Sequence, residues 1–137
     1  MTKRSKLRRK TSDFGEDVLL EVGDASHPSW PPATFDAVIS RHVVWALPDP
    51  IDALARWVAL LRDGGHLILV EGQWEIGSGI SAPAIVSMLP PEVAEVEVHP
   101  LTDPLLWGRE VSDERYMVTA RVARAPVAES AAQFQGR

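Results

Sequence analysis

The chain has 137 residues, of which 45% are hydrophobic and 24% charged, so it is long enough to bury one core and has the composition of a globular protein. It contains no cysteine, which excludes disulfides and thiolate-based metal or redox chemistry. No apolar run approaches the roughly 18 residues of a membrane span and no apolar leader follows the basic amino terminus, so we predict a cytoplasmic protein that does not enter a membrane.

The formal net charge of −5 hides a basic amino terminus. Six of the 14 Lys and Arg residues fall within the first ten positions, which leaves eight basic against 19 acidic residues in the rest of the chain. A basic arm can bind phosphate backbones. Because no aromatic residues are interleaved with it and no second basic patch follows, the pattern favours a solvated helix or arm over residues 1–16 and argues against nucleic acid as a partner.

After this arm, residues 18–22 are rich in β-forming side chains and end at Gly23, which predicts a strand. Residues 25–34 contain three prolines and are predicted to be a loop. Residues 35–40 form a near-continuous apolar run, as in a parallel strand that is buried on both faces.

A helix with clear boundaries follows. Asp49 suits the N-cap, Pro50 the first helical position, and Gly64 and Gly65 a glycine stop. The apolar residues recur at helical spacing, at Ile51, Leu54, Val58 and Leu61, and Trp57 beside them is predicted to be core. Residues 66–71 are a second apolar strand. Strand, helix and strand in this order predict a right-handed parallel βαβ unit and therefore an α/β fold.

Beyond Gly72 the signals are weaker. They predict a short helix over 82–89, alternating strands over 93–98 and 116–122, a loop between these strands, and a mobile tail over 126–137.

Several stretches together resemble the later motifs of class I S-adenosylmethionine-dependent methyltransferases of the type 11-like group. They are EVGDA at 21–25, TFDAVISRH at 34–42 and LLRDGGHLILVEG at 60–72, and the residues at 101–108 and 113–116 are similar to the final strands of small-molecule members. Each motif is weak alone. In the correct order they form a specific resemblance that covers about residues 7–124.

The resemblance implies an incomplete sheet. Family members begin with a strand and a glycine-rich turn that receives the cofactor, and these 137 residues contain no such turn. The family sheet has the order 3-2-1-4-5-7-6, so we expect residues 17–125 to form an incomplete Rossmann-like sheet with parallel strands and an antiparallel carboxyl-terminal strand, missing the first two family strands. The strand at 35–40 would then lack its neighbour, and its exposed edge predicts a homodimer or a complementing chain.

The resemblance also implies a cofactor, S-adenosylmethionine, and residues that contact it. Asp24 matches the acid that accepts a hydrogen bond from the adenine amino group, and the Ala25 N–H would point at the ring. Asp24 can instead cap its own turn. Ser40 and Arg41 end the central strand, where the family faces the methionine end of the cofactor and the substrate. Arg41 can pair with a carboxylate of either one, or equally with Asp36 or Asp49.

His42 is the candidate general base, because imidazole titrates near neutral pH, although many methyltransferases need no base and a structural role for His42 is an even alternative. Trp30, Trp45 and Trp74 lie on predicted loops and can wall a pocket, with Trp45 and Trp74 assigned to the substrate. For Trp30 and Trp74 a packing role is an even alternative. Glu71 ends a strand and could contact the substrate, but surface solvation is the favoured interpretation. The other histidines, His27, His66 and His99, are too dispersed to form a ligand cluster, so we predict no metal site.

Three hypotheses follow for function. The first is the carboxyl-terminal part of a methyltransferase that acts on a small-molecule substrate once the cofactor half is supplied. The second is a non-catalytic remnant that works as a dimerisation or interaction module. The third is a truncated gene model of a complete enzyme.

Overall fold

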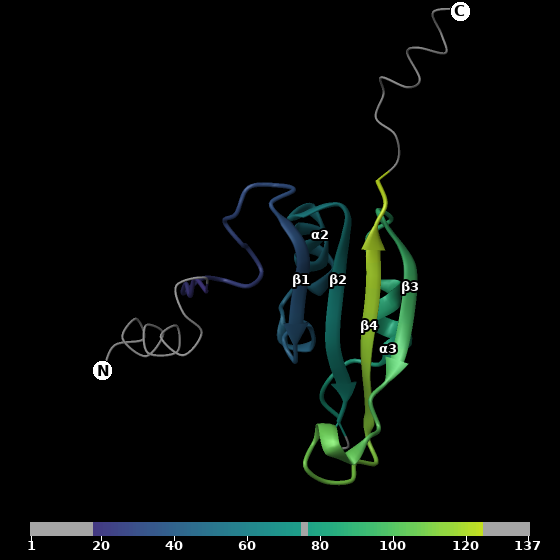
Figure 1. Ribbon diagram of the computed structural model, residues 1–137. Helices are drawn as coiled ribbons and strands as arrows, with labels where there is room; N and C mark the ends of the chain where they lie inside the picture. The colour runs from purple at the N-terminus through teal and green to yellow at the C-terminus, as the bar shows by residue number, and fades with distance from the viewer. Residues whose placement is uncertain (1–17, 75–76, 125–137) are drawn as a thin grey trace, which may run out of the picture.

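The computed structural model describes residues 18–74 and 77–124 (Figure 1), so the predicted arm at 1–16 and tail at 126–137 lie outside the described residues. The described residues contain four strands, two α-helices and two 3-10 turns. Within them no helix is both long and apolar enough to cross a bilayer. The elements are β1 (Phe35–Arg41), η1 (Val44–Ala46), α2 (Pro50–Ala59), β2 (Leu61–Gln73), α3 (Ala82–Ser87), β3 (Val93–Pro100), η2 (Pro104–Leu106) and β4 (Glu114–Val122).

The four strands form one sheet in the order β1-β2-β4-β3. β1 pairs in parallel with β2, and β4 runs antiparallel to both β2 and β3. This confirms the predicted α/β class and the antiparallel carboxyl-terminal strand. The order is that of the last four strands of the family sheet, 4-5-7-6, and it leaves β1 at an edge of the sheet.

Helix α2 begins as the sequence predicts. The Asp49 carboxylate accepts the N–H of Asp52 at 3.1 Å, and Pro50 takes the first turn. Its buried stripe consists of Ala53, Leu54, Trp57 and Val58. Ile51 is 60% exposed, contrary to the prediction, because at 100° per residue it falls roughly 90° from the centre of that stripe.

The end of α2 differs from the glycine stop that was predicted. The helix ends at Ala59, and the two glycines lie within β2. The reason is a competing set of hydrogen bonds: the carbonyl of Ala59 accepts the N–H of Ala33, and that of Leu60 accepts the N–H groups of Thr34 and Phe35. The chain that enters β1 thereby takes carbonyls that a longer helix would use.

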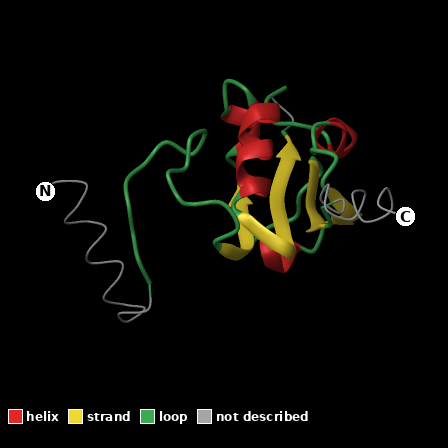
Figure 2. Cartoon of the chain, turned by 90° about the horizontal axis from the view of Figure 1, so that it is seen from above, coloured by secondary structure: helices red, strands yellow, loops and turns green. Residues whose placement is uncertain are grey.

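The predicted strand at 18–22 was wrong. This segment is irregular and extends away from the sheet in Figures 1 and 2, with Leu19 69% and Val22 59% exposed. A strand needs a neighbour to accept its backbone hydrogen bonds, and in the described part of the chain none lies beside it.

One face of the sheet carries the core. Alternate residues of β2 and β4, including Leu67, Leu69 and Val118, pack in one cluster with α2 and with Ala82 and Ile85 of α3, so both helices cover the same face. In Figure 1 both helices lie behind the strands. The other face is built from the intervening residues, and no described helix covers it.

Candidate functional site

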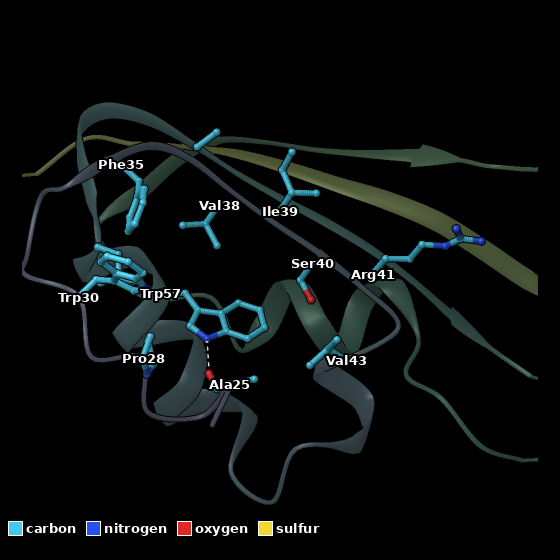
Figure 3. Close-up of a pocket in the computed structure, with 12 residues that line it drawn as sticks. Ala25, Pro28, Trp30, Phe35, Val38, Ile39, Ser40, Arg41, Val43 and Trp57 are labelled. Carbon is cyan, nitrogen blue, oxygen red and sulfur yellow. Dashed lines mark hydrogen bonds between the residues drawn. The ribbon is translucent and has the colours of Figure 1, made fainter. Parts of the chain in front are cut away.

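The free edge of β1 borders a groove of about 410 Å³ (Figure 3). Residues from both faces of β1 line this groove, so it follows the edge of the strand and does not open into one face. The Trp57 indole N–H donates to the Ala25 carbonyl at 2.8 Å and holds the far wall in place. The lining residues are Ala25, Pro28, Trp30, Phe35, Ala37, Val38, Ile39, Ser40, Arg41, Val43, Trp57 and Leu60.

Three of the four predicted cofactor residues, Ala25, Ser40 and Arg41, meet in this groove. The Ser40 hydroxyl is buried and has no hydrogen-bond partner within the described part of the chain. Asp24 lies beside the groove and caps its own turn, accepting the Ser26 N–H at 2.9 Å. Its carboxylate is nevertheless 68% exposed and so remains accessible to a ligand.

His42 reverses the chain where β1 ends. Its N–H continues the ladder to the carbonyl of Val70 at 2.9 Å, but its φ is +55°, in the left-handed region that non-glycine residues rarely adopt. Such a conformation persists only where its surroundings hold it, and it occurs preferentially at functional sites.

Glu71 holds the turn that follows His42. Its Oε1 accepts the N–H groups of Val43 at 3.1 Å and Val44 at 2.8 Å. The prediction that Glu71 is solvated was wrong: the side chain is 0% exposed, and burial raises the pKa of its carboxyl group above the usual range. The carboxylate is drawn inside because it satisfies two N–H groups of the turn.

A cluster of aromatic and arginine side chains surrounds His42, and we call it the aromatic–arginine cluster. The His42 ring meets Trp74 edge-on at 4.9 Å and stacks on Trp107 at 6.0 Å between ring centroids. The guanidinium of Arg115 lies 4.3 Å from the Trp107 ring centroid and 5.3 Å from that of Trp74, and the guanidinium of Arg41 lies 5.6 Å from that of Trp107.

The strand register explains why these side chains meet. Arg41 pairs with Val70 and Arg115 pairs with Gly72, and neighbours in register share a face of the sheet. Because Leu69 and Glu71 alternate with them and point into the core, Arg41 and Arg115 belong to the face without helices. Gly72 is required there, since a Cβ at this position would overlap the Trp74 ring.

The charges of the cluster are unequal. Arg115 forms a two-bonded ion pair with Asp113, at 2.7 and 3.2 Å, whereas no described acid lies within ion-pair distance of Arg41. The alternative pairing of Arg41 was wrong, because Asp36 binds Arg62 at 2.9 Å and Asp49 caps α2.

Burial, together with the positive charges of Arg41 and Arg115, lowers the pKa of His42. This shift favours the neutral form of the imidazole. Its Nε2 is buried and has no hydrogen-bond partner in the described ranges.

The predicted tryptophans are divided between these places. Trp30 lines the groove and packs edge-on against Phe35 at 5.7 Å, while Trp74 belongs to the aromatic–arginine cluster. Trp45 is 41% exposed in η1 and does not line the groove. Within residues 18–74 and 77–124, no three His, Cys, Asp or Glu side chains gather as metal ligands.

Sequence reasoning did not single out Trp107, Arg115 or the buried role of Glu71. The loop between β3 and β4 reaches the end of β1 only because β4 inserts beside β2, which the local sequence does not reveal. The available signal was the resemblance of residues 101–108 and 113–116 to the last family strands.

Comparisons with known proteins identify the family. The Methyltransferase domain family matches residues 1–69, half of the chain. Aklanonic acid methyltransferase DauC of Streptomyces sp. (strain C5) is 29% identical over 112 residues, which cover 80% of this chain and 48% of that protein. The chain therefore spans about half the length of this curated relative.

Solved structures support the fold. N-methyltransferase NodS of Bradyrhizobium japonicum WM9, in complex with S-adenosyl-l-homocysteine, superposes with a TM-score of 0.69 at 16% identity and covers 90% of this chain and 64% of that one. A SAM-dependent methyltransferase of Thermotoga maritima gives 0.65 at 17% identity, over 89% and 70% of the two chains. At these identities the likeness concerns the fold alone.

The sheet order and the likeness to solved structures define a Rossmann-like α/β fold. With the family match over half of its length, the chain belongs to the Methyltransferase domain family of class I S-adenosylmethionine-dependent methyltransferases.

Proposed function

We propose that this chain provides the carboxyl-terminal half of an S-adenosylmethionine-dependent methyltransferase, and that it transfers a methyl group to a small-molecule acceptor when the cofactor half is supplied. The supporting observation is the groove along β1. It follows a free strand edge and contains residues from both faces of the strand, which is the shape that an adjacent strand would fill. The missing strands can come from another segment or from another chain.

The residues of the groove fit the cofactor. A buried hydroxyl without a partner, that of Ser40, costs free energy unless a ligand or an added segment pairs with it. The exposed carboxylate of Asp24 is a pure acceptor and suits the adenine amino group. Ala25 would complete this wall, and Arg41, which lines the groove and reaches the Trp107 ring, would lie between the cofactor and the acceptor. S-adenosylmethionine, when bound, supplies an electrophilic methyl group.

His42, which follows β1 and lies beside the groove, would act on the acceptor. Its neutral imidazole can take the proton that leaves an acceptor hydroxyl or amine, held at Nε2, which has no partner among the described residues. Trp45 and Trp74 would contact the acceptor, and the Glu71 carboxylate would keep His42 in place through the N–H groups of the turn. Orientation of the acceptor would contribute much of the rate.

A second candidate function is a non-catalytic dimerisation or interaction module. The open edge of β1 favours it, together with the uncovered face of the sheet, on which Ile39 is 69% exposed. In that case a second copy of the chain would occupy the groove. The cytoplasmic location and the dimer both stay predictions.

Calorimetric titration with S-adenosylhomocysteine separates the two candidates. The first sample is the chain alone, and the second is a chimera in which the first half of the Streptomyces relative precedes residue 18. We expect no binding by the first and micromolar binding by the second. Ser40→Ala in the chimera should weaken binding, whereas Ser87→Ala, an exposed site in α3, should not. A chimera that folds without binding S-adenosylhomocysteine, and a chain that forms a stable dimer by ultracentrifugation, would support the interaction module instead.

A further inference from the structure

The aromatic–arginine cluster contains one positive charge, that of Arg41, which no described acid neutralises and which the proposed role of His42 does not require. Of its two guanidinium groups, that of Arg115 is neutralised by Asp113, and both side chains of this pair are nearly buried, at 13% and 11% exposed. Arg41 is exposed at the end of β1 with its guanidinium laid over the Trp107 ring. The two acids that the sequence offers as its partners, Asp36 and Asp49, are engaged elsewhere.

Other charges near the cluster do not cancel that of Arg41. Glu71 is on the core face of β2 and gives its Oε1 to the turn. Glu114 directs its carboxylate to the N–H of Ala82 at the start of α3. Arg109 adds a further positive charge beside Asp113. The described part of the cluster therefore presents a net positive surface next to aromatic rings.

The geometry also disfavours a cationic ligand. Tryptophan faces attract ammonium groups, but here guanidinium groups already lie over both rings. A protonated amine would meet occupied ring faces and the free charge of Arg41. A planar carboxylate, in contrast, matches the fork of a guanidinium with two parallel hydrogen bonds.

We propose that the aromatic–arginine cluster selects an acceptor that carries a carboxylate on a planar aromatic ring, with the carboxylate bound by Arg41 and the ring lying beside the half-buried indoles of Trp74 and Trp107, whose faces the guanidinium groups already cover. This inference rests on the proposed function, because it names the substrate class of that reaction. It adds a specificity-determining residue, Arg41, whose charge is matched to the acceptor.

The test uses three probes of one shape on the 137-residue chain: 2-naphthoate, neutral 2-naphthamide and cationic 2-naphthylmethylammonium. Binding is followed by ligand-detected NMR and by the indole N–H signals of the protein. We expect naphthoate to bind at least about tenfold more tightly than either other probe, as a charge-assisted bidentate contact implies. Arg41→Gln should remove this preference, and Arg41→Lys should retain part of it.

A matched control is Arg56→Gln, because Arg56 is an exposed arginine on α2 that pairs with Asp52 at 2.8 Å, and this substitution should leave all three affinities unchanged. Equal or tighter binding of the ammonium probe, an unchanged preference in Arg41→Gln, or no naphthoate binding would each overturn the inference. None of these readouts involves the cofactor. Failure of S-adenosylhomocysteine to bind the chimera would count against the proposed function only.

Discussion

The two faces of this sheet differ in how completely they are covered. On one face, α2 and α3 seal a cluster in which Leu67, Leu69 and Val118 are each 0% exposed. On the other face, Ile39 is 69% exposed, although it belongs to a strand whose sequence is that of a buried central strand. The contrast shows that β1 has the sequence of a strand buried on both faces, whereas only one of its faces is covered here.

The largest expected effect compares aliphatic side chains from the two faces. Leu69→Ala should lower the free energy of unfolding by about 3 kcal/mol, because it opens a cavity in the sealed core. Ile39→Ala should change it by less than about 0.5 kcal/mol in the monomer, because its side chain is exposed. Urea unfolding of both variants measures this. Similar losses in a monomeric chain would mean that the second face is covered.

The next effect concerns Glu71, which joins the core face to the turn at His42. Glu71→Ala should cost about 2 kcal/mol, because the N–H groups of Val43 and Val44 lose a buried acceptor. Glu71→Gln keeps an acceptor oxygen and should cost less. Thermal unfolding of the three proteins compares these costs, and an Ala variant as stable as the Gln variant would contradict the role given to this side chain.

The pH dependence of the Glu71 variants has a defined sign. Since burial raises the carboxyl pKa in the folded state, the folded protein binds the proton more tightly than the unfolded chain. The stability of the wild type relative to Glu71→Gln should therefore be greatest below the ordinary carboxyl pKa and fall as the pH rises through the raised value. A relative stability that instead increases over this range would show that the carboxyl pKa is not raised.

Ser40→Ala should leave the stability of the chain unchanged or slightly raised, and should weaken the binding of the cofactor. Removing a buried hydroxyl that has no partner should leave the chain as stable or up to about 1 kcal/mol more stable. In the chimera the same change should weaken S-adenosylhomocysteine. A loss of stability in the chain alone would indicate that the hydroxyl already has a partner there.

The smallest effect is on the titration of His42. Arg41→Gln removes one of the positive charges that lower the His42 pKa, so this pKa should rise toward its ordinary value. Arg56→Gln is the control and should leave it unchanged. Proton NMR of the imidazole follows both titrations. An unchanged His42 pKa in Arg41→Gln would contradict the claim that the charge of Arg41 acts on His42.

Much of the fold was predictable because its signals are local. The cap formed by Asp49 and Pro50, and the apolar runs at 35–40 and 66–71, identified the parallel unit, and the ordered motifs identified the family. The strand predicted at 18–22 failed because a strand depends on a neighbour, and local propensity carries no information about whether one exists.

The site was predictable in part for the same reason. Ser40, Arg41 and His42 lie at the end of a strand in a known motif and could be named in advance. Trp107 and Arg115 join them through the placement of β4, and the burial of Glu71 depends on two N–H groups from a distant turn. Such contacts follow from the sheet order and not from residue spacing.

The central claim is that β1 is a central strand whose outer edge is open in this chain. Hydrogen exchange of the backbone amides from Phe35 to Arg41 tests it most directly, because alternate amides of an edge strand have no acceptor. We predict that about every second amide exchanges rapidly in the monomeric chain and becomes protected in the chimera with the first half of the relative. Full protection in the monomer, or no gain of protection in the chimera, would contradict the claim.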